Sequence, residues 1–100
     1  MMTPTDRMIA AAAEWSNLPR EAMTGAGKRR EVAYARFACW CVMRRRGMTL
    51  WQIAHRFNRD HSTVVSGLKQ AAWLEQNRPD FAAMVAHVAA AAGEDRRAAA

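Results

Sequence analysis

The chain has 100 residues and a formal net charge of +6 at pH 7. Domains usually run to roughly 100–150 residues, so the sequence predicts one helical domain over residues 1–93 and a frayed tail over residues 94–100. No apolar run approaches the roughly 20 residues of a membrane-spanning helix, and the amino terminus has no signal-peptide pattern. Cys39 and Cys41 fall on nearly opposite faces of a helical pattern, which excludes a mutual disulfide and indicates a reducing cytoplasm.

The positive charge is concentrated in the middle of the chain. Residues 20–59 carry ten Lys or Arg against two Glu, a net charge of +8, whereas the segments on either side each carry −1. A focused basic region in a small domain favours a polyanionic partner. A merely solvated basic face is the alternative that charge alone leaves open.

The first third of the chain predicts a capped helix followed by a basic loop. Thr3 is placed to cap a helix that has Pro4 at its first position and stops at Asn17-Leu18-Pro19. A brief helical turn is predicted from Pro19 to Met23. The segment Thr24–Arg30 follows as an irregular loop, in which two glycines allow the backbone to approach a ligand closely.

The periodicity from Glu31 to Arg46 predicts a longer helix that Gly47 ends. Arg36 and Arg44 are expected to point away from its apolar face. That face is predicted to consist of Val32, Ala35, Cys39, Val42 and Met43.

Two shorter patterns then predict a helix-turn-helix. Thr49 and Gln52 have the spacing of a capping box at the start of a helix over Leu50–Phe57. Asn58-Arg59 forms a tight turn, and Asp60 is the predicted N-cap of a second helix over His61–Gln76. The residues expected to face inward are Leu50, Ile53, Ala54 and Phe57 on the first helix and Val64, Val65, Leu68, Ala71 and Ala72 on the second.

A last helix completes an all-α domain. Asn77-Arg78-Pro79 breaks the chain, Asp80 is the predicted cap, and the helix continues to about Ala92, with Gly93 as its stop. Its apolar side is predicted to consist of Phe81, Met84, Val85 and Val88. The sequence contains no strand pattern and no internal repeat.

The start of the second helix of the helix-turn-helix carries the predicted function. In this motif the first helix braces the second, which presents its amino-terminal turn to a DNA major groove. Asp60, His61, Ser62 and Thr63 have small or polar side chains that reach base edges or phosphates. An isolated histidine is more often structural, but its place at this turn favours a contact.

The string Arg59-Asp60-His61-Ser62-Thr63-Val64-Val65 resembles the signature of the carboxy-terminal DNA-binding domain of DnaA, the bacterial chromosomal replication initiator, also called domain IV. Further segments resemble the family in order and spacing, so that the resemblance covers roughly residues 8–90. These segments are Ala13-Glu14-Trp15, Glu21-Ala22-Met23, Lys28-Arg29-Arg30, Ala35-Arg36-Phe37-Ala38, Thr49-Leu50-Trp51-Gln52-Ile53 and Asp80-Phe81.

The resemblance implies sequence-specific binding of double-stranded DNA at DnaA-box-like sites. Residues 60–63 fall where the family reads the major groove, and Lys28 and Arg29 fall in the loop that enters the adjacent minor groove. A narrow A·T-rich minor groove attracts basic side chains. Arg36, Arg44, Val64, Ser66 and Lys69 fall at or near backbone and sugar contacts. The whole predicted interface comprises Lys28, Arg29, Arg30, Arg36, Arg44, Thr49, Arg59, Asp60, His61, Ser62, Thr63, Val64, Ser66 and Lys69.

The sequence also departs from the family pattern. The turn at Asn58 is shorter than the family's glycine-bearing turn, Trp51 stands where Pro is common, Lys28 where Arg is frequent and Ser66 where His is frequent. These 100 residues contain no ATPase domain. The resemblance therefore implies a DNA-binding protein in the bacterial nucleoid that has no catalysis, cofactor, nucleotide or membrane contact. It would bind as a monomer and regulate replication initiation or transcription, with contacts to other proteins of those processes.

Other motifs in the sequence carry less weight. Gly25-Ala26-Gly27-Lys28 lacks the full spacing of a phosphate-binding loop. The two cysteines with His55 and His61 lack zinc-ligand spacing, so core thiols are expected. The four tryptophans could stack on single-stranded bases, but helical spacing favours core or subunit contacts. The alternative function is a protein-interaction module that docks to an initiator, or to itself, through Trp73 and the Ala-rich last helix.

Overall fold

The computed structural model describes residues 2–93. That part of the chain contains six helices and no strand, which confirms the all-α prediction. The helices run over Pro4–Trp15 (α1), Glu21–Thr24 (α2), Arg30–Arg45 (α3), Leu50–Arg56 (α4), His61–Asn77 (α5) and Pro79–Ala92 (α6). The frayed tail predicted for residues 94–100 lies outside the described residues.

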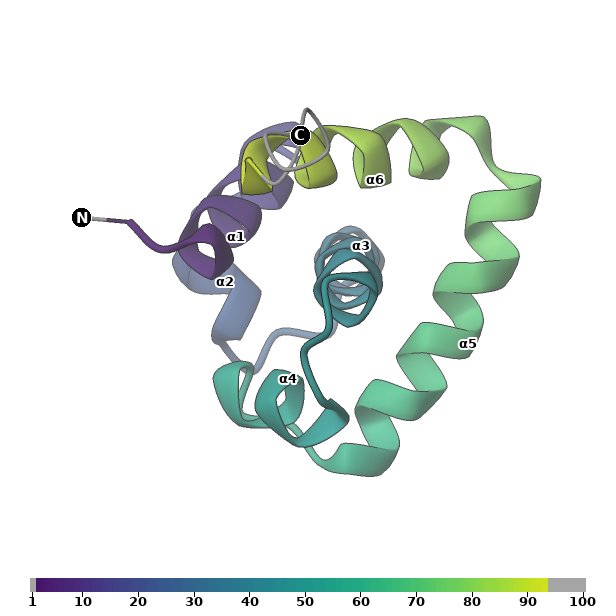
Figure 1. Cartoon of the computed structure of the whole chain (residues 1–100). Helices are drawn as coiled ribbons and strands as arrows, with labels where there is room; N and C mark the ends of the chain where they lie inside the picture. Colours follow the sequence, from purple (N-terminus) through teal and green to yellow (C-terminus); the bar gives the residue numbers. More distant parts are fainter. Residues whose placement is uncertain (1, 94–100) are drawn as a thin grey trace.

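Helix α3 is the centre of the fold. Figure 1 views it end-on, with α1, α6, α5 and α4 arranged around it, and α3 contacts each of them. Because neighbours surround α3, its buried residues are not confined to the predicted face and also include Arg36, Ala38, Trp40 and Cys41. The prediction of one apolar face was therefore too narrow, since helical periodicity detects a stripe and not a helix enclosed by others.

Two helices start at the predicted capping residues. The Thr3 hydroxyl accepts a hydrogen bond from the Asp6 backbone N–H at 3.1 Å, and the Asp6 carboxylate accepts one from the Thr3 N–H at 3.2 Å. Thr49 and Gln52 make the same reciprocal pair at 3.1 and 2.8 Å. Both boxes satisfy N–H groups that the helix itself leaves unpaired, and they fix where α1 and α4 begin.

Two predicted caps differ in the structure. Helix α6 begins at Pro79, so Arg78 takes the N-cap position and Asp80 lies inside the first turn, where its carboxylate accepts from the Phe81 N–H at 2.9 Å. Proline favours the first helical position because its missing N–H needs no partner there. Asp60 does hold the N-cap position of α5, but its side chain makes no capping hydrogen bond.

The packing of α5 on α3 depends on Gly67. A methyl group at this position would lie 2.7 Å from Cε3 of Trp40 and 2.9 Å from Cε1 of Phe37, and closer still to Cζ3 of Trp40. The buried residues of α5 are Val64, Gly67, Ala71 and Leu74. Ala72 is exposed, contrary to the prediction. The face of α5 that packs on α3 contains Gly67, and Ala72 lies off this face.

Candidate nucleic-acid interface

Helices α4 and α5 form the predicted helix-turn-helix at one side of the molecule (Figure 1). Phe57 is fully buried against Trp40, with the two ring centroids 5.7 Å apart in an edge-to-face arrangement. The turn depends on Asn58, which adopts a left-handed φ of +54°, a conformation that asparagine tolerates better than most residues. The Arg59 backbone N–H then closes the turn by donating to the carbonyl of Ala54 at 2.9 Å.

The first turn of α5 presents polar side chains to solvent. Asp60, Ser62, Thr63 and Ser66 are exposed, and His61 is half-buried. Within residues 2–93, the side chains of His61, Ser62 and Thr63 make no hydrogen bond, so their polar atoms are available to an external partner. The Asp60 backbone carbonyl accepts from the N–H groups of Thr63 and Val64. The Asp60 carboxylate makes no capping hydrogen bond, and the residue is exposed.

Val64 does not belong to this surface. Its side chain is fully buried in the core, as the periodicity predicted, and it cannot also contact a sugar or phosphate. Ser62, Thr63, Ser66 and Gln70 instead line a shallow groove of about 360 Å³ beside Phe37 and Gly67. The exposed face of α5 therefore continues along the helix through Ser66 and Gln70.

The basic loop before α3 is held by a buried arginine. The Arg36 side chain is only 5% exposed, and its guanidinium donates four hydrogen bonds to backbone carbonyls. The acceptors are Met23 (2.7 Å), Gly27 (2.8 Å), Ala22 (2.9 Å) and Gly25 (2.7 Å). Burial lowers the pKa of this guanidinium, and the positive charge of Arg59 lowers it further. Arg36 thus fixes the path of the chain between α2 and α3.

This position corrects the role expected of Arg36. The sequence predicted that it points away from the apolar face, and the resemblance placed it at or near the DNA backbone. All of its donor nitrogens are instead engaged by the chain itself. The sequence did contain one signal that Arg36 is buried: it lies one helical turn from Val32 and from Cys39, which were both predicted to be buried. Burial of an arginine is rare enough that exposure was the default expectation.

Arg59 joins the basic loop to the helix-turn-helix. Its Nη2 donates to the carbonyl of Gly25 at 2.5 Å, and its Nη1 donates to the carbonyls of Phe57 and Asn58 at 3.0 and 3.2 Å. Arg36 and Arg59 therefore share the Gly25 carbonyl from two different elements. These bonds fix the position of the loop relative to the turn.

A hollow of about 460 Å³ lies between the loop and α5. Lys28 lies on its loop side and Thr63 on its α5 side, with Trp40 and Phe37 among its other lining residues. Lys28 is exposed and makes no intrachain ion pair among the described residues. The loop at Lys28 and the first turn of α5, the two segments predicted to enter the DNA grooves, consequently border one hollow and are not on opposite sides of the molecule.

The remaining predicted residues are more dispersed. Arg29 pairs with Glu31 at 2.6 Å, and Arg30 is the exposed first residue of α3. Arg44 lies near the opposite end of α3, where it donates to the Met48 carbonyl at 3.0 Å. Thr49 and Lys69 are exposed, on the cap of α4 and on α5 respectively. The structure therefore brings together the loop and the start of α5, with Arg44 some distance along α3.

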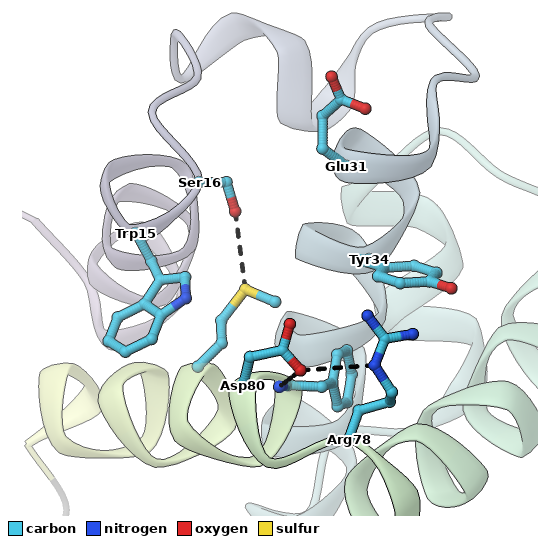
Figure 2. A pocket seen from close by; sticks show the side chains of 8 residues that line it. Trp15, Ser16, Glu31, Tyr34, Arg78 and Asp80 are labelled. Carbon is cyan, nitrogen blue, oxygen red and sulfur yellow. Dashed lines mark hydrogen bonds and ion pairs between the residues drawn. The ribbon is translucent and has the colours of Figure 1, made fainter.

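A second pocket, of about 240 Å³, lies away from the helix-turn-helix (Figure 2). Trp15 and Ser16 border it from the end of α1, Tyr34 from α3, and Asp80 from the start of α6. Its contacts are internal, such as Ser16 Oγ to Met84 Sδ at 3.7 Å and Arg78 Nε to Asp80 Oδ1 at 3.6 Å. It contains no basic cluster and no reactive group, so we do not assign it to the interface.

The cysteines are buried free thiols whose pKa values are raised by burial, as expected of core residues. Among residues 2–93, no group of three side chains is arranged to hold a metal ion. None of the described helices has the length and apolar character needed to cross a membrane.

A two-helix motif with a polar, exposed first turn on its second helix, beside a basic loop, defines a helix-turn-helix DNA-binding domain. The model of one particular family, the bacterial dnaA protein helix-turn-helix, matches residues 5–71. The chain belongs to this DnaA carboxy-terminal family, which is a family of DNA-binding domains. The comparison with curated proteins found no match to the chain.

Proposed function

We propose that this protein binds double-stranded DNA sequence-specifically, with the start of α5 in a major groove and the loop at Lys28 in the adjacent minor groove. The observation that carries the proposal is the shared hollow bordered by Lys28 and Thr63. Because the loop at Lys28 and the first turn of α5 lie on one face, they reach neighbouring grooves of one duplex. The bonds from Arg36 and Arg59 reduce the ordering that binding would otherwise require.

Three groups of residues contribute to this interface. His61, Ser62 and Thr63, with Asp60, contact bases through side-chain polar atoms that have no hydrogen-bond partner among residues 2–93. Lys28, Arg29 and Arg30 supply positive charge to the minor groove. Arg44, Thr49, Ser66 and Lys69 contact phosphates or sugars, which position the protein without reading sequence. Arg36 and Arg59 position the loop, and Val64 supports α5 from the core.

One recognition helix and one loop read two unlike grooves, so the protein binds an asymmetric site as a monomer. It acts by occupancy alone and requires no catalysis or cofactor. Binding at DnaA-box-like sites in the bacterial nucleoid would compete with the initiator for those sites and thereby regulate replication or nearby transcription.

The test begins with selection of bound sequences from a random duplex library, followed by titration of the selected duplex. Thr63→Ala and His61→Ala should each weaken binding to the selected duplex by about 1–3 kcal/mol and binding to a scrambled duplex much less. Wild-type affinity should fall with salt at a slope of about −0.9 per phosphate neutralised. Equal loss on both duplexes would refute the major-groove assignment.

Arg78→Ala is the matched charge control for Lys28→Ala. Arg78 is exposed and lies at the far end of α5, about 25 Å along the helix axis from His61. Lys28→Ala should flatten the salt slope by about one, and Arg78→Ala should leave it unchanged. Equal slopes for the two variants would remove the loop from the interface.

A protein-interaction module is the second candidate, favoured by the 59% exposure of Trp73 on α5. The Ala-rich helix contributes less to it than expected, because its larger apolar residues are buried within the domain and α6 packs against α1 and α3. Association that is insensitive to salt but abolished by Trp73→Ala would favour this candidate over DNA binding.

A further inference from the structure

The most exposed large hydrophobic side chain of the helix-turn-helix lies against the proposed base-reading histidine. Trp51, the second residue of α4, is 69% exposed, and its ring centroid lies 4.5 Å from that of His61, the first residue of α5. The planes are inclined by 33°, so the two rings are partly stacked. Of the described aromatic side chains, His61 is the only one in ring contact with Trp51.

The local fold fixes the positions of both Trp51 and His61. The capping box of Thr49 and Gln52 fixes the first turn of α4, and buried Ile53 and Ala54 orient that helix on the core. Trp51 consequently points away from the core. The closed turn at Asn58 then places His61 next to the indole.

Trp51 adds little to the core, since most of its surface remains in water. Its contact with His61 does restrict the imidazole. Stacking covers a face of the ring, whereas the two nitrogens lie at the ring edge and make no hydrogen bond within residues 2–93. The indole therefore restrains the imidazole through its ring face, while the two ring nitrogens stay available to hydrogen-bond a ligand.

We propose that Trp51 is a specificity-determining positioning residue, which holds the His61 imidazole in the orientation that reads a base edge. This inference rests on the proposed function. Without the indole, His61 samples other rotamers and must be ordered when it binds, which lowers affinity where His61 reads a base. Binding that uses only the DNA backbone is unaffected.

A double-mutant cycle tests the proposal on the selected duplex and on a scrambled duplex. Trp51→Ala should weaken binding to the selected duplex by about threefold to tenfold, and binding to the scrambled duplex by less than about twofold. In a His61→Ala background, Trp51→Ala should have no further effect on the selected duplex. Trp51→Phe, which keeps a stacking ring, should restore most of the selectivity.

Trp73→Ala is the matched control, because Trp73 is similarly exposed but lies on α5 three turns from His61. It should leave selectivity unchanged. Unchanged selectivity in Trp51→Ala, or losses that multiply when both Trp51 and His61 are replaced, would overturn the positioning role. Failure of the wild type to bind any duplex would overturn the proposed function together with this inference. Selective binding by the wild type, with undiminished selectivity in Trp51→Ala, would overturn the inference alone.

Discussion

Replacing Arg36 with methionine removes the guanidinium but keeps much of the apolar stem. Four charged hydrogen bonds to loop carbonyls disappear. Each such bond contributes about 1.5–3 kcal/mol. The carbonyls of exposed Gly27 and of half-buried Ala22 and Gly25 can accept water instead, so the net loss is smaller than the sum. We expect the free energy of unfolding to fall by about 2–4 kcal/mol.

Urea denaturation followed by circular dichroism measures this loss. Domains of this size unfold at about 5–15 kcal/mol, so the variant should remain folded in water at low temperature. The melting temperature should fall by about 4–8 °C for each kcal/mol lost.

DNA titration of the same variant separates a positioning role from a phosphate contact. Loss of the loop conformation should weaken binding to the selected duplex, while the slope of log affinity against log salt stays unchanged. A lost phosphate contact would flatten that slope by about 0.9, as we expect for Arg44→Ala. A flattened slope in Arg36→Met, together with a change of less than about 0.5 kcal/mol in the free energy of unfolding, would show that Arg36 contacts phosphate and does not position the loop.

Three further changes test the fold around the site. Gly67→Ala should destabilise the protein by about 1–3 kcal/mol in urea, because the new methyl meets Trp40, although the same change usually stabilises a helix. Gly27→Ala is its control, since nothing lies within 4 Å of the added methyl, and its effect should stay within about 0.5 kcal/mol. Thr49→Ala should cost about 1 kcal/mol of unfolding free energy as a lost cap, and an unchanged midpoint would contradict the capping role. The Arg45 hydrogen bond holds the pKa of Glu75 below its ordinary value of 4.5, so the pair stabilises the fold above that pH and its contribution disappears on acidification. Glu75→Gln should therefore be less stable than wild type near neutral pH, and the difference should shrink below about pH 4; a difference that does not depend on pH would contradict this.

Local signals predicted the helices well because short-range chemistry fixes where they begin and end. Thr3 caps its helix and Thr49 forms a capping box, both as expected, and Gly47 and Gly93 have the left-handed φ of helix ends, +100° and +77°. The predicted N-cap position of Asp60 is confirmed, although its side chain makes no capping hydrogen bond, whereas the predicted cap at Asp80 was wrong. A residue type that favours the N-cap does not guarantee that its side chain makes the capping bond. Helix α6 begins at Pro79, two residues before the start that a cap at Asp80 implies.

The site was less predictable because its organisation depends on contacts between distant segments. The bond from Arg59 to the Gly25 carbonyl spans 34 residues, and Arg36 reaches back 9 to 14 residues to the loop. Periodicity carries no information on such pairs. The ring contact between Trp51 and His61 likewise appears only once the turn places the starts of α4 and α5 side by side.

We expect the loop at Lys28 and the first turn of α5 to bind one duplex together. Backbone amide chemical shifts of the labelled protein, recorded during titration with the selected duplex, report on both segments at once. Residues 26–30 and 60–63 should show large shift changes that saturate together at one protein per duplex, with little change around Trp73. Changes confined to one of these segments, or centred on Trp73, would contradict this expectation.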